Sequence, residues 1–168
     1  MPPEVPEPQT ILPTPVGSLL IHGEPRGISR IRWLPGEPAA PPPVAGTPPI
    51  LDRTRVALEA YLRDPRTLPA GVPLAPVPAT PHQLRVWRAM RAIPPGRPLT
   101  YGQLAALLGS SPRAVGNAAA ANPWPLLVPC HRVVGRGGAG GYLGEAEGAG
   151  PRIKRWLLER EGWRADGG

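Results

Sequence analysis

The sequence predicts an α+β protein, with a small antiparallel sheet and a helix in the N-terminal part and a helical domain containing a helix–turn–helix in the C-terminal part. Residues 28–34 alternate between two faces, as in a half-buried antiparallel strand. Twenty of the 28 prolines lie before residue 82, whereas two helix-capping patterns begin at Thr80 and Thr100. We therefore expect the architecture to change near residue 80.

The N-terminal domain is expected to span residues 9–79. Residues 1–8 contain four prolines and predict a disordered tail, and residues 35–49 predict a proline-rich loop. Apolar runs separated by glycine and proline predict three short strands, at Ile11–Leu12, Leu19–Ile21 and Ile28–Leu34. In the third strand, we expect Ile28, Arg30 and Arg32 on one face and Ser29, Ile31 and Trp33 on the other. A helix is expected over Leu51–Arg63, with a stripe formed by Leu51, Leu58 and Leu62.

The C-terminal domain is expected to span residues 80–168. A capping box at Thr80–Gln83 predicts a helix that buries Leu84, Trp87 and Met90 and ends at Pro94–Gly96. A second box at Thr100–Gln103 predicts a short helix over Leu104–Leu108 that stops at Gly109, and a third helix is expected over Arg113–Ala121. A short helix, a tight turn and a second helix form a helix–turn–helix, a common DNA-binding arrangement.

The third helix has few of the long polar side chains that contact base edges in the major groove, because only Arg113 and Asn117 could make such contacts. Its small residues favour close approach to a narrow groove, which predicts sequence-tolerant binding in the minor groove. The alternative is that the small residues only let this helix pack closely against a neighbouring helix.

The last helix is expected to run from near Pro151 to Gly162, after a glycine-rich loop at 135–142 that we expect to be mobile. Helical spacing places Ile153, Trp156, Leu157, Arg160 and Glu161 on one inward stripe, and Glu159 points away from it. A buried carboxylate needs a partner. His131 is the candidate that we expect for Glu161.

Charge is concentrated in the C-terminal half. Residues 1–81 hold seven arginines and seven acidic residues, whereas residues 82–168 carry the whole net charge of +7. This asymmetry indicates a polyanion partner, and an arginine-rich composition without binding meaning is the alternative. No apolar run could span a bilayer and the N-terminus lacks a signal peptide, so we expect a cytoplasmic protein without a membrane partner. We also expect a monomer. The three histidines have no metal-ligand spacing, so neither a metal nor another cofactor is expected.

Cys130, the only cysteine, stands beside His131. A lone cysteine is most often a small buried hydrophobe, and the alternative is a nucleophile. Adjacent residues do not face each other on a helix, so a water between Cys130 and His131, with Glu161 orienting the imidazole, is the more plausible relay. A cysteine hydrolase that uses His22 or His82 as its base stays open, although it leaves the helix–turn–helix unexplained.

These residues together resemble the O6-alkylguanine-DNA alkyltransferases (methylated-DNA–protein-cysteine methyltransferases). The resemblance covers about residues 80–162 and rests on eight motifs: Val86–Trp87, Ile93–Gly96, Thr100–Gly102, Arg113–Gly116, Asn122–Pro123, Val128–Val133, Gly141–Tyr142 and Lys154–Gly162. It implies a ribonuclease-H-like N-terminal domain and a winged-helix-like C-terminal domain. It also implies double-stranded DNA containing O6-alkylguanine as the partner, with O4-alkylthymine as a further candidate substrate.

The resemblance implies a role for nine residues. Cys130 corresponds to the alkyl acceptor, His131 and Glu161 to the water-linked relay, and Asn122 to the residue that steadies the turn. Tyr101 corresponds to a tyrosine that crowds a phosphate and donates to the guanine, and Arg113 to an arginine that fills the gap left by the extruded base. Ala114, the next residue, is expected to contact the DNA or the substrate. Val133 and Tyr142 correspond to pocket-lining positions.

The implied reaction is DNA repair by a suicide transfer, in which Cys130 irreversibly takes one alkyl group from a flipped base. The alternative from another class is a non-catalytic, alkyltransferase-like protein that only recognises the damage. Such relatives replace the cysteine, whereas this chain keeps it. The chain departs from the family at Leu143, which we expect to narrow the pocket, and at residues 145–150, which have the composition of an insertion.

Overall fold

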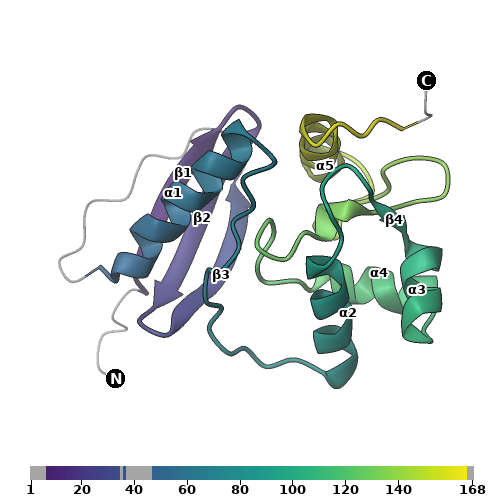
Figure 1. Cartoon of the computed structure of the whole chain (residues 1–168), viewed down its shortest axis with the longest axis horizontal. Coiled ribbons are helices and arrows are strands. Elements are labelled where there is room, and N and C mark those ends of the chain that lie inside the picture. Colours follow the sequence, from purple (N-terminus) through teal and green to yellow (C-terminus); the bar gives the residue numbers. More distant parts are fainter. Residues whose placement is uncertain (1–6, 35, 37–46, 166–168) are drawn as a thin grey trace. The chain divides into compact units, whose positions relative to one another are not determined.

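The computed structural model of the protein describes residues 7–34, 36 and 47–165 (Figure 1). The contacts between residues divide the chain into two units, and the boundary in the sequence lies between Val77 and Pro78. Each unit is described by itself. Residues 1–6 of the expected tail and most of the expected proline-rich loop at 35–49 lie outside the described residues. Among the helices that are described, none has the length and apolar character needed to cross a membrane.

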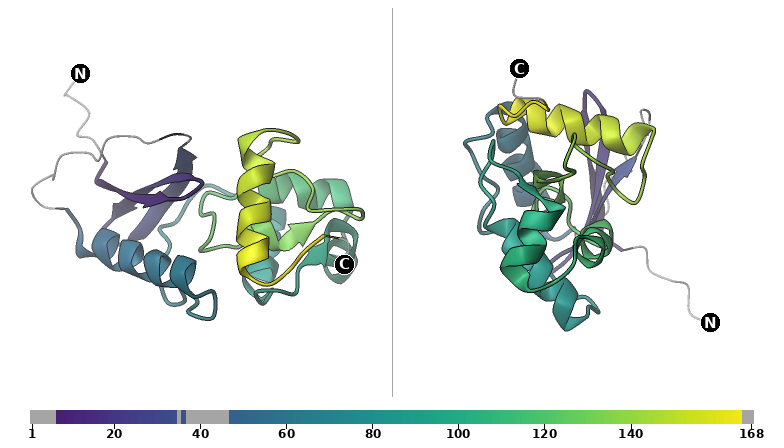
Figure 2. Two further views of the ribbon diagram at one scale, coloured as in Figure 1. Left: turned by 90° about the horizontal axis from the view of Figure 1, so that it is seen from above. Right: turned by 90° about the vertical axis from the view of Figure 1, so that its right-hand side faces the viewer.

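The N-terminal unit is a three-stranded antiparallel sheet covered by one helix. Its strands β1 (Gln9–Thr14), β2 (Gly17–Glu24) and β3 (Gly27–Leu34) are neighbours in chain order. Helix α1 (Pro49–Arg63) lies along one face of this sheet (Figure 2). The core between them contains side chains that are completely buried, among them Leu19, Ile21, Leu51 and Leu58. The predicted α+β class with a small antiparallel sheet is confirmed.

A bulge interrupts the expected alternation in β3. Gly23 pairs with Ile28 and His22 pairs with Arg30, so Ser29 is an extra residue in the ladder. An extra residue shifts the side chains that follow it to the opposite face. Ile28 and Ile31 are therefore both buried, and the prediction that Ile28 shares a face with the exposed Arg30 is wrong.

The C-terminal unit is mainly helical. Its four α-helices are α2 (Pro81–Arg91), α3 (Tyr101–Leu108), α4 (Pro112–Ala120) and α5 (Ala149–Arg160). A 3-10 turn, η1 (Cys130–Arg132), leads into β5 (Val133–Val134), which pairs in parallel with β4 (Leu99–Thr100). Both predicted capping boxes are formed. Helix α3 ends at Gly109 in the left-handed region, and α4 begins three residues later, as the helix–turn–helix pattern predicts.

Helix α2 turns a different face inward from the one expected. Val86, Trp87 and Met90 are buried, whereas Leu84 is 47% exposed. The inward stripe is centred between Val86 and Met90, and at 100° per residue Leu84 lies on the far side of it. The expectation that Leu84 belongs to the buried face is wrong.

The inward stripe of α5 is also rotated from the predicted one. Ile153 and Leu157 are buried as expected, but they are joined by Lys154 and Leu158, whereas Arg160 is exposed. Arg160 lies 5.0 Å from the ring centroid of Trp156, outside the core. The side chain of Glu161, the residue that ends α5, is completely buried and Glu159 is exposed, so the predicted contrast between these two carboxylates is confirmed.

Candidate active site around Cys130

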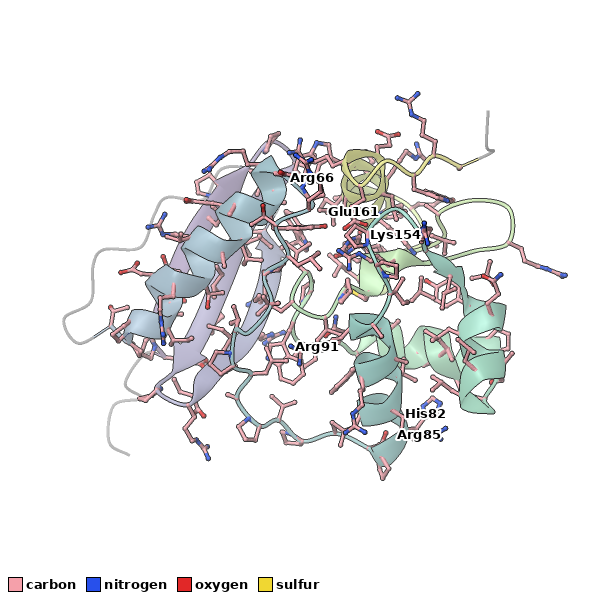
Figure 3. All side chains as sticks on the ribbon, viewed as in Figure 1. Arg66, His82, Arg85, Arg91, Lys154 and Glu161 are labelled. Carbon is pink, nitrogen blue, oxygen red and sulfur yellow. The ribbon has the colours of Figure 1, made fainter. Side chains whose placement is uncertain are left out.

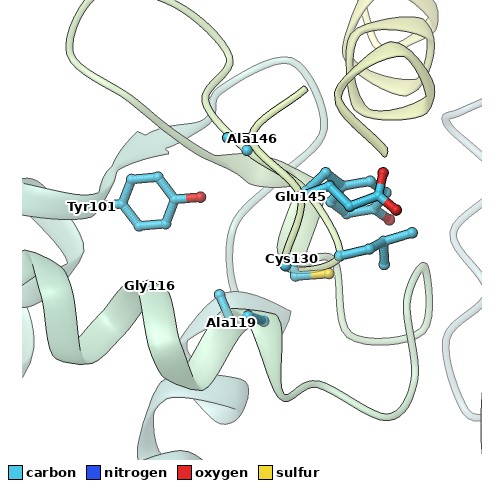
Figure 4. A pocket seen from close by; sticks show the side chains of 11 residues that line it. Tyr101, Gly116, Ala119, Cys130, Glu145 and Ala146 are labelled. Carbon is cyan, nitrogen blue, oxygen red and sulfur yellow. The ribbon is translucent and has the colours of Figure 1, made fainter. Parts of the chain in front are cut away.

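Cys130 lies against a cavity of about 260 Å³ in the C-terminal unit (Figure 4). One side of the cavity is formed by Tyr101 of α3 and by Gly116, Ala119 and Ala120 of α4. The other side is the loop segment 141–146. The thiol itself is almost buried, at 5% exposure. A reactant must therefore enter the cavity to reach the sulfur.

The small residues of α4 have two structural consequences. Gly116, Ala119 and Ala120 leave space for the cavity, because longer side chains would fill it. Val115 and Ala118 are buried inside the unit, where the indole Nε1 of Trp87 donates to the carbonyl of Ala118 at 2.8 Å. Close packing against α2, the alternative given above, thus accounts for one face of α4, and the cavity accounts for the other.

His131, which follows Cys130 in η1, forms a buried pair with Glu161. His131 Nε2 lies 2.9 Å from Glu161 Oε1, and neither side chain is exposed. A carboxylate can only accept, so Nε2 of a neutral imidazole carries the hydrogen and Nδ1 carries the lone pair. Burial lowers the pKa of His131, and the nearby carboxylate opposes that shift. The predicted partnership of Glu161 with His131 is confirmed.

Arg132 is a second partner of Glu161 that the sequence did not indicate. Its guanidinium donates to the carboxylate from Nε at 3.1 Å and from a terminal nitrogen at 2.8 Å. The other terminal nitrogen donates to the carbonyl of Ile93 at 2.8 Å. Glu161 thus holds two of the three η1 side chains, those of His131 and Arg132, which fixes the turn that carries Cys130.

Asn122 connects the end of α4 to the segment before Cys130. Its amide nitrogen donates to the carbonyl of Val128 at 2.8 Å, and its amide oxygen accepts from the backbone N–H of Trp124 at 3.0 Å. Burial raises the pKa of the Cys130 thiol, and hydrogen bonds from Asn122 and Tyr142 act in the opposite direction. The resting group is a thiol that needs a base before it can attack.

Lys154 is a further candidate for a functional residue. The buried stripe that the sequence predicted for α5 did not include it. This residue of α5 (labelled in Figure 3) is completely buried, and its ammonium donates to the carbonyl of Gly141 at 2.9 Å and to the hydroxyl of Tyr101 at 3.3 Å. Two signals in the sequence point to it. It is the single lysine among eighteen arginines, and it precedes Glu161 by seven residues, which puts both on one helix face.

The predicted site residues fall into three groups. Cys130, Tyr101 and Tyr142 line the cavity, whereas His131 and Glu161 bond to each other and Asn122 bonds to the Cys130 thiol. Arg113, in the first turn of α4, is exposed, and Ala114 donates its N–H to the Ser111 hydroxyl. Val133 is buried in β5 and is not among the residues that line this cavity. Nowhere in the described ranges do three His, Cys, Asp or Glu side chains gather as a metal site would require.

Comparisons with known proteins identify relatives over nearly the whole chain. Residues 81–163 match the family described as 6-O-methylguanine DNA methyltransferase, DNA binding domain. The methylated-DNA–protein-cysteine methyltransferase of Rattus norvegicus is 35% identical over 91% of this chain and 81% of its own length. A DNA base-flipping protein of Thermus thermophilus is 42% identical over 90% of this chain and 97% of its own. The crystal structure of Mycobacterium tuberculosis OGT in complex with DNA is similar with a TM-score of 0.69, at 31% identity over 94% of each chain.

Proposed function

Because the chain belongs to the 6-O-methylguanine DNA methyltransferase family, we propose that it repairs DNA by moving the alkyl group of an O6-alkylguanine onto Cys130. One observation carries the proposal. The only cysteine of the chain lines a cavity, and the next residue is the histidine of a buried histidine–carboxylate pair. The need for a free thiol suits a reducing compartment such as the cytoplasm.

The pair supplies the base that the thiol lacks. His131 accepts the thiol proton on Nδ1 through one water molecule, and Glu161 stabilises the imidazolium that forms. The sulfur then attacks the alkyl carbon, and the bond from that carbon to O6 breaks. Tyr101 donates a proton to the departing guanine. Since a thioether is a poor leaving group, each protein molecule acts once.

The alkylated base reaches Cys130 by leaving the duplex. A sulfur that is almost buried cannot approach a stacked base, and extrusion of a base costs a few kcal/mol. The small side chains of α4 allow the helix to approach the minor groove closely. The exposed Arg113 fills the gap left by the base. We place the protein on DNA as a monomer, with a winged-helix-like C-terminal domain and a ribonuclease-H-like N-terminal one.

A second candidate is damage recognition without chemistry. It is favoured by the relative from Thermus thermophilus, which is named a DNA base-flipping protein. Both candidates need the cavity and α4, but only the transferase needs a thiol with a base behind it. The Cys130, His131 and Glu161 arrangement therefore favours transfer.

Intact-protein mass spectrometry after mixing with a duplex that contains one O6-methylguanine tests the proposal. We expect a gain of one methyl group on the peptide that contains Cys130, saturating at one per protein. Cys130→Ala should bind the same duplex and gain no mass. Tight binding of the unaltered protein without a mass change would instead establish damage recognition. A matched duplex with O4-methylthymine measures whether the second substrate is also accepted.

A further inference from the structure

The turn of the helix–turn–helix lies between α3 and α4 and consists of Gly109, Ser110 and Ser111. None of these three residues has an apolar side chain that could anchor the turn in a core. The Ser111 hydroxyl caps α4 by accepting from the N–H of Ala114 at 3.2 Å. The position of the turn on the rest of the unit therefore depends on polar contacts.

Two side chains of α2 make such contacts, and both point towards the end of α3 (Figure 3). His82 Nε2 lies 2.8 Å from the hydroxyl oxygen of Ser110. The guanidinium of Arg85 donates to the carbonyl of Leu108, the last residue of α3, at 2.7 Å. A cation is favourable there, because the C-terminal end of a helix is negative. His82 and Arg85 are three residues apart, which puts them on one face of α2.

Helix α2 also holds the far end of α4. The indole of Trp87 donates to the carbonyl of Ala118 at 2.8 Å, in the last turn of α4. The N-terminal end of α4 is held by α2 only through the turn at 109–111 that His82 and Arg85 contact. Arg113 is the second residue of α4 and is exposed, so its position depends on how that first turn is held.

We propose that His82 and Arg85 are positioning residues that fix the turn at 109–111 and thereby hold Arg113 where it fills the gap left by the flipped base. This inference rests on the proposed base extrusion and deepens it. A side chain that must enter a gap of fixed size has to be held within roughly 0.5 Å of its working position. The inference also assigns Arg85 to a contact within the protein, although an arginine in the basic half would otherwise be expected to neutralise a phosphate.

The test is the affinity for a duplex with one O6-methylguanine and for the same duplex with guanine, measured by fluorescence anisotropy. The full chain with Cys130→Ala is the parent protein, because it lacks the sulfur that would react. His82→Ala should weaken binding to the lesion duplex roughly fivefold, the usual effect of one hydrogen bond. It should change binding to the undamaged duplex less than about twofold, because no base leaves the stack there. The ratio of the two affinities, the lesion preference, therefore decreases.

Ser110 provides a test of the same contact from the other side. Ser110→Ala should reduce the lesion preference as much as His82→Ala does, and the two losses should not add because they remove one contact. His82→Gln should restore the preference, since its amide nitrogen can take the place of Nε2. A contact that only stabilises the fold would lower the free energy of unfolding in urea and leave the lesion preference unchanged.

Arg85→Met distinguishes a contact within the protein from a contact with DNA. If Arg85 holds the turn, the variant should lose lesion preference and keep the salt slope of the parent protein. A slope shallower by roughly 0.9 would show that Arg85 neutralises a phosphate, which would overturn its assignment. Arg88→Met is the matched control, because Arg88 is the exposed arginine three residues further along α2. It should keep the lesion preference.

A double-mutant cycle with Arg113→Ala tests whether the contacts act through Arg113. In the Arg113→Ala protein, His82→Ala should weaken binding to the lesion duplex by less than about twofold. A full fivefold loss there would overturn the inference, and so would an unchanged lesion preference in Ser110→Ala. Ser110→Ala decides the matter if His82→Ala does not fold. Absence of methyl transfer by the unaltered protein would instead refute the proposed transfer, and the lesion preference would still be measurable.

Discussion

At the scale of single residues, the site depends on one carboxylate with two partners. Glu161 accepts from His131 and Arg132 and is completely buried. Removing its charge leaves the buried Arg132 guanidinium without the opposite charge with which it is paired. We expect Glu161→Gln to lower the free energy of unfolding by about 3–5 kcal/mol. The exposed Glu159→Gln on the same helix should change it by less than about 0.5 kcal/mol. Urea unfolding measures both, and equal effects would contradict the structure.

His131 gives the protein a pH dependence of stability. Burial lowers its pKa in the folded state below the ordinary value of 6.5. The unfolded chain therefore takes up the proton first as the pH falls. The free energy of unfolding is at its full value above pH 6.5 and decreases below it, by at most about 1.4 kcal/mol per pH unit.

The substitution His131→Asn, which puts a side chain that does not titrate in place of the imidazole, measures that contribution. Urea unfolding at a series of pH values should give a shallower acid slope for the variant than for the unaltered protein. Burial also lowers the pKa of His22, but His22 is present in both proteins, so the difference isolates His131. Parallel slopes would mean that His131 is protonated to the same extent in the folded and unfolded states.

At the scale of elements, the turn at 142–145 forms part of the cavity wall under backbone strain. Tyr142 and Glu145 exchange two backbone hydrogen bonds of 2.9 Å, and Leu143 and Gly144 between them have φ of 56° and 78°. Positive φ at both central residues defines a type I′ turn, which favours asparagine or glycine over leucine. Leu143 lines the cavity from this position, as expected from the sequence.

Leu143→Asn should therefore act on both stability and specificity. Asparagine tolerates positive φ, so we expect a gain of roughly 1 kcal/mol in the free energy of unfolding. The smaller volume of its side chain should raise the rate on O6-benzylguanine relative to O6-methylguanine roughly tenfold. Leu68→Asn, another exposed leucine but in the N-terminal unit, should leave that rate ratio unchanged. A constant ratio in Leu143→Asn would show that other residues limit the size of the alkyl group.

The elements differ in how well local sequence determines them. The starts of α2 and α3 could be predicted because Thr80 and Thr100 bond to backbone within their own first turns. The inward face of α5 could not, because lysine is rarely buried and Lys154 is held by Gly141 and Tyr101, which are distant in sequence. The bulge at Ser29 could not be predicted either, because it depends on how β3 pairs with β2 and the alternation of residues within β3 contains no information on that pairing.

The site shows the same division. His131 could be assigned to Glu161 because helical spacing turns Glu161 inward and a buried carboxylate needs a partner. Arg132 could not, since an arginine next to a histidine is ordinarily a solvated side chain. The cavity itself depends on how α4 faces the segment 141–146, and that arrangement is tertiary.

At the scale of the whole molecule, the positive charge that favours binding to DNA lies in the C-terminal half. Residues 82–168 carry the net charge of +7, and the N-terminal half is neutral. Binding should weaken steeply with salt, because log Kd changes with log salt by roughly 0.9 for each phosphate neutralised. A flat response would count against DNA as the partner.

Arg113, in the basic C-terminal half, could act on DNA in two ways. It could fill the gap left by the flipped base, or it could neutralise a phosphate of the DNA backbone. If it occupies the gap left by the flipped base, Arg113→Ala should weaken binding to a lesion duplex by roughly 1–3 kcal/mol, the usual value of a stacking contact. Its salt slope should equal that of the unaltered protein. A slope shallower by roughly 0.9 would show that Arg113 neutralises a phosphate instead. Arg53→Ala, an exposed arginine of α1 in the neutral half, should change neither quantity. Fluorescence anisotropy with a labelled duplex over a salt series measures both.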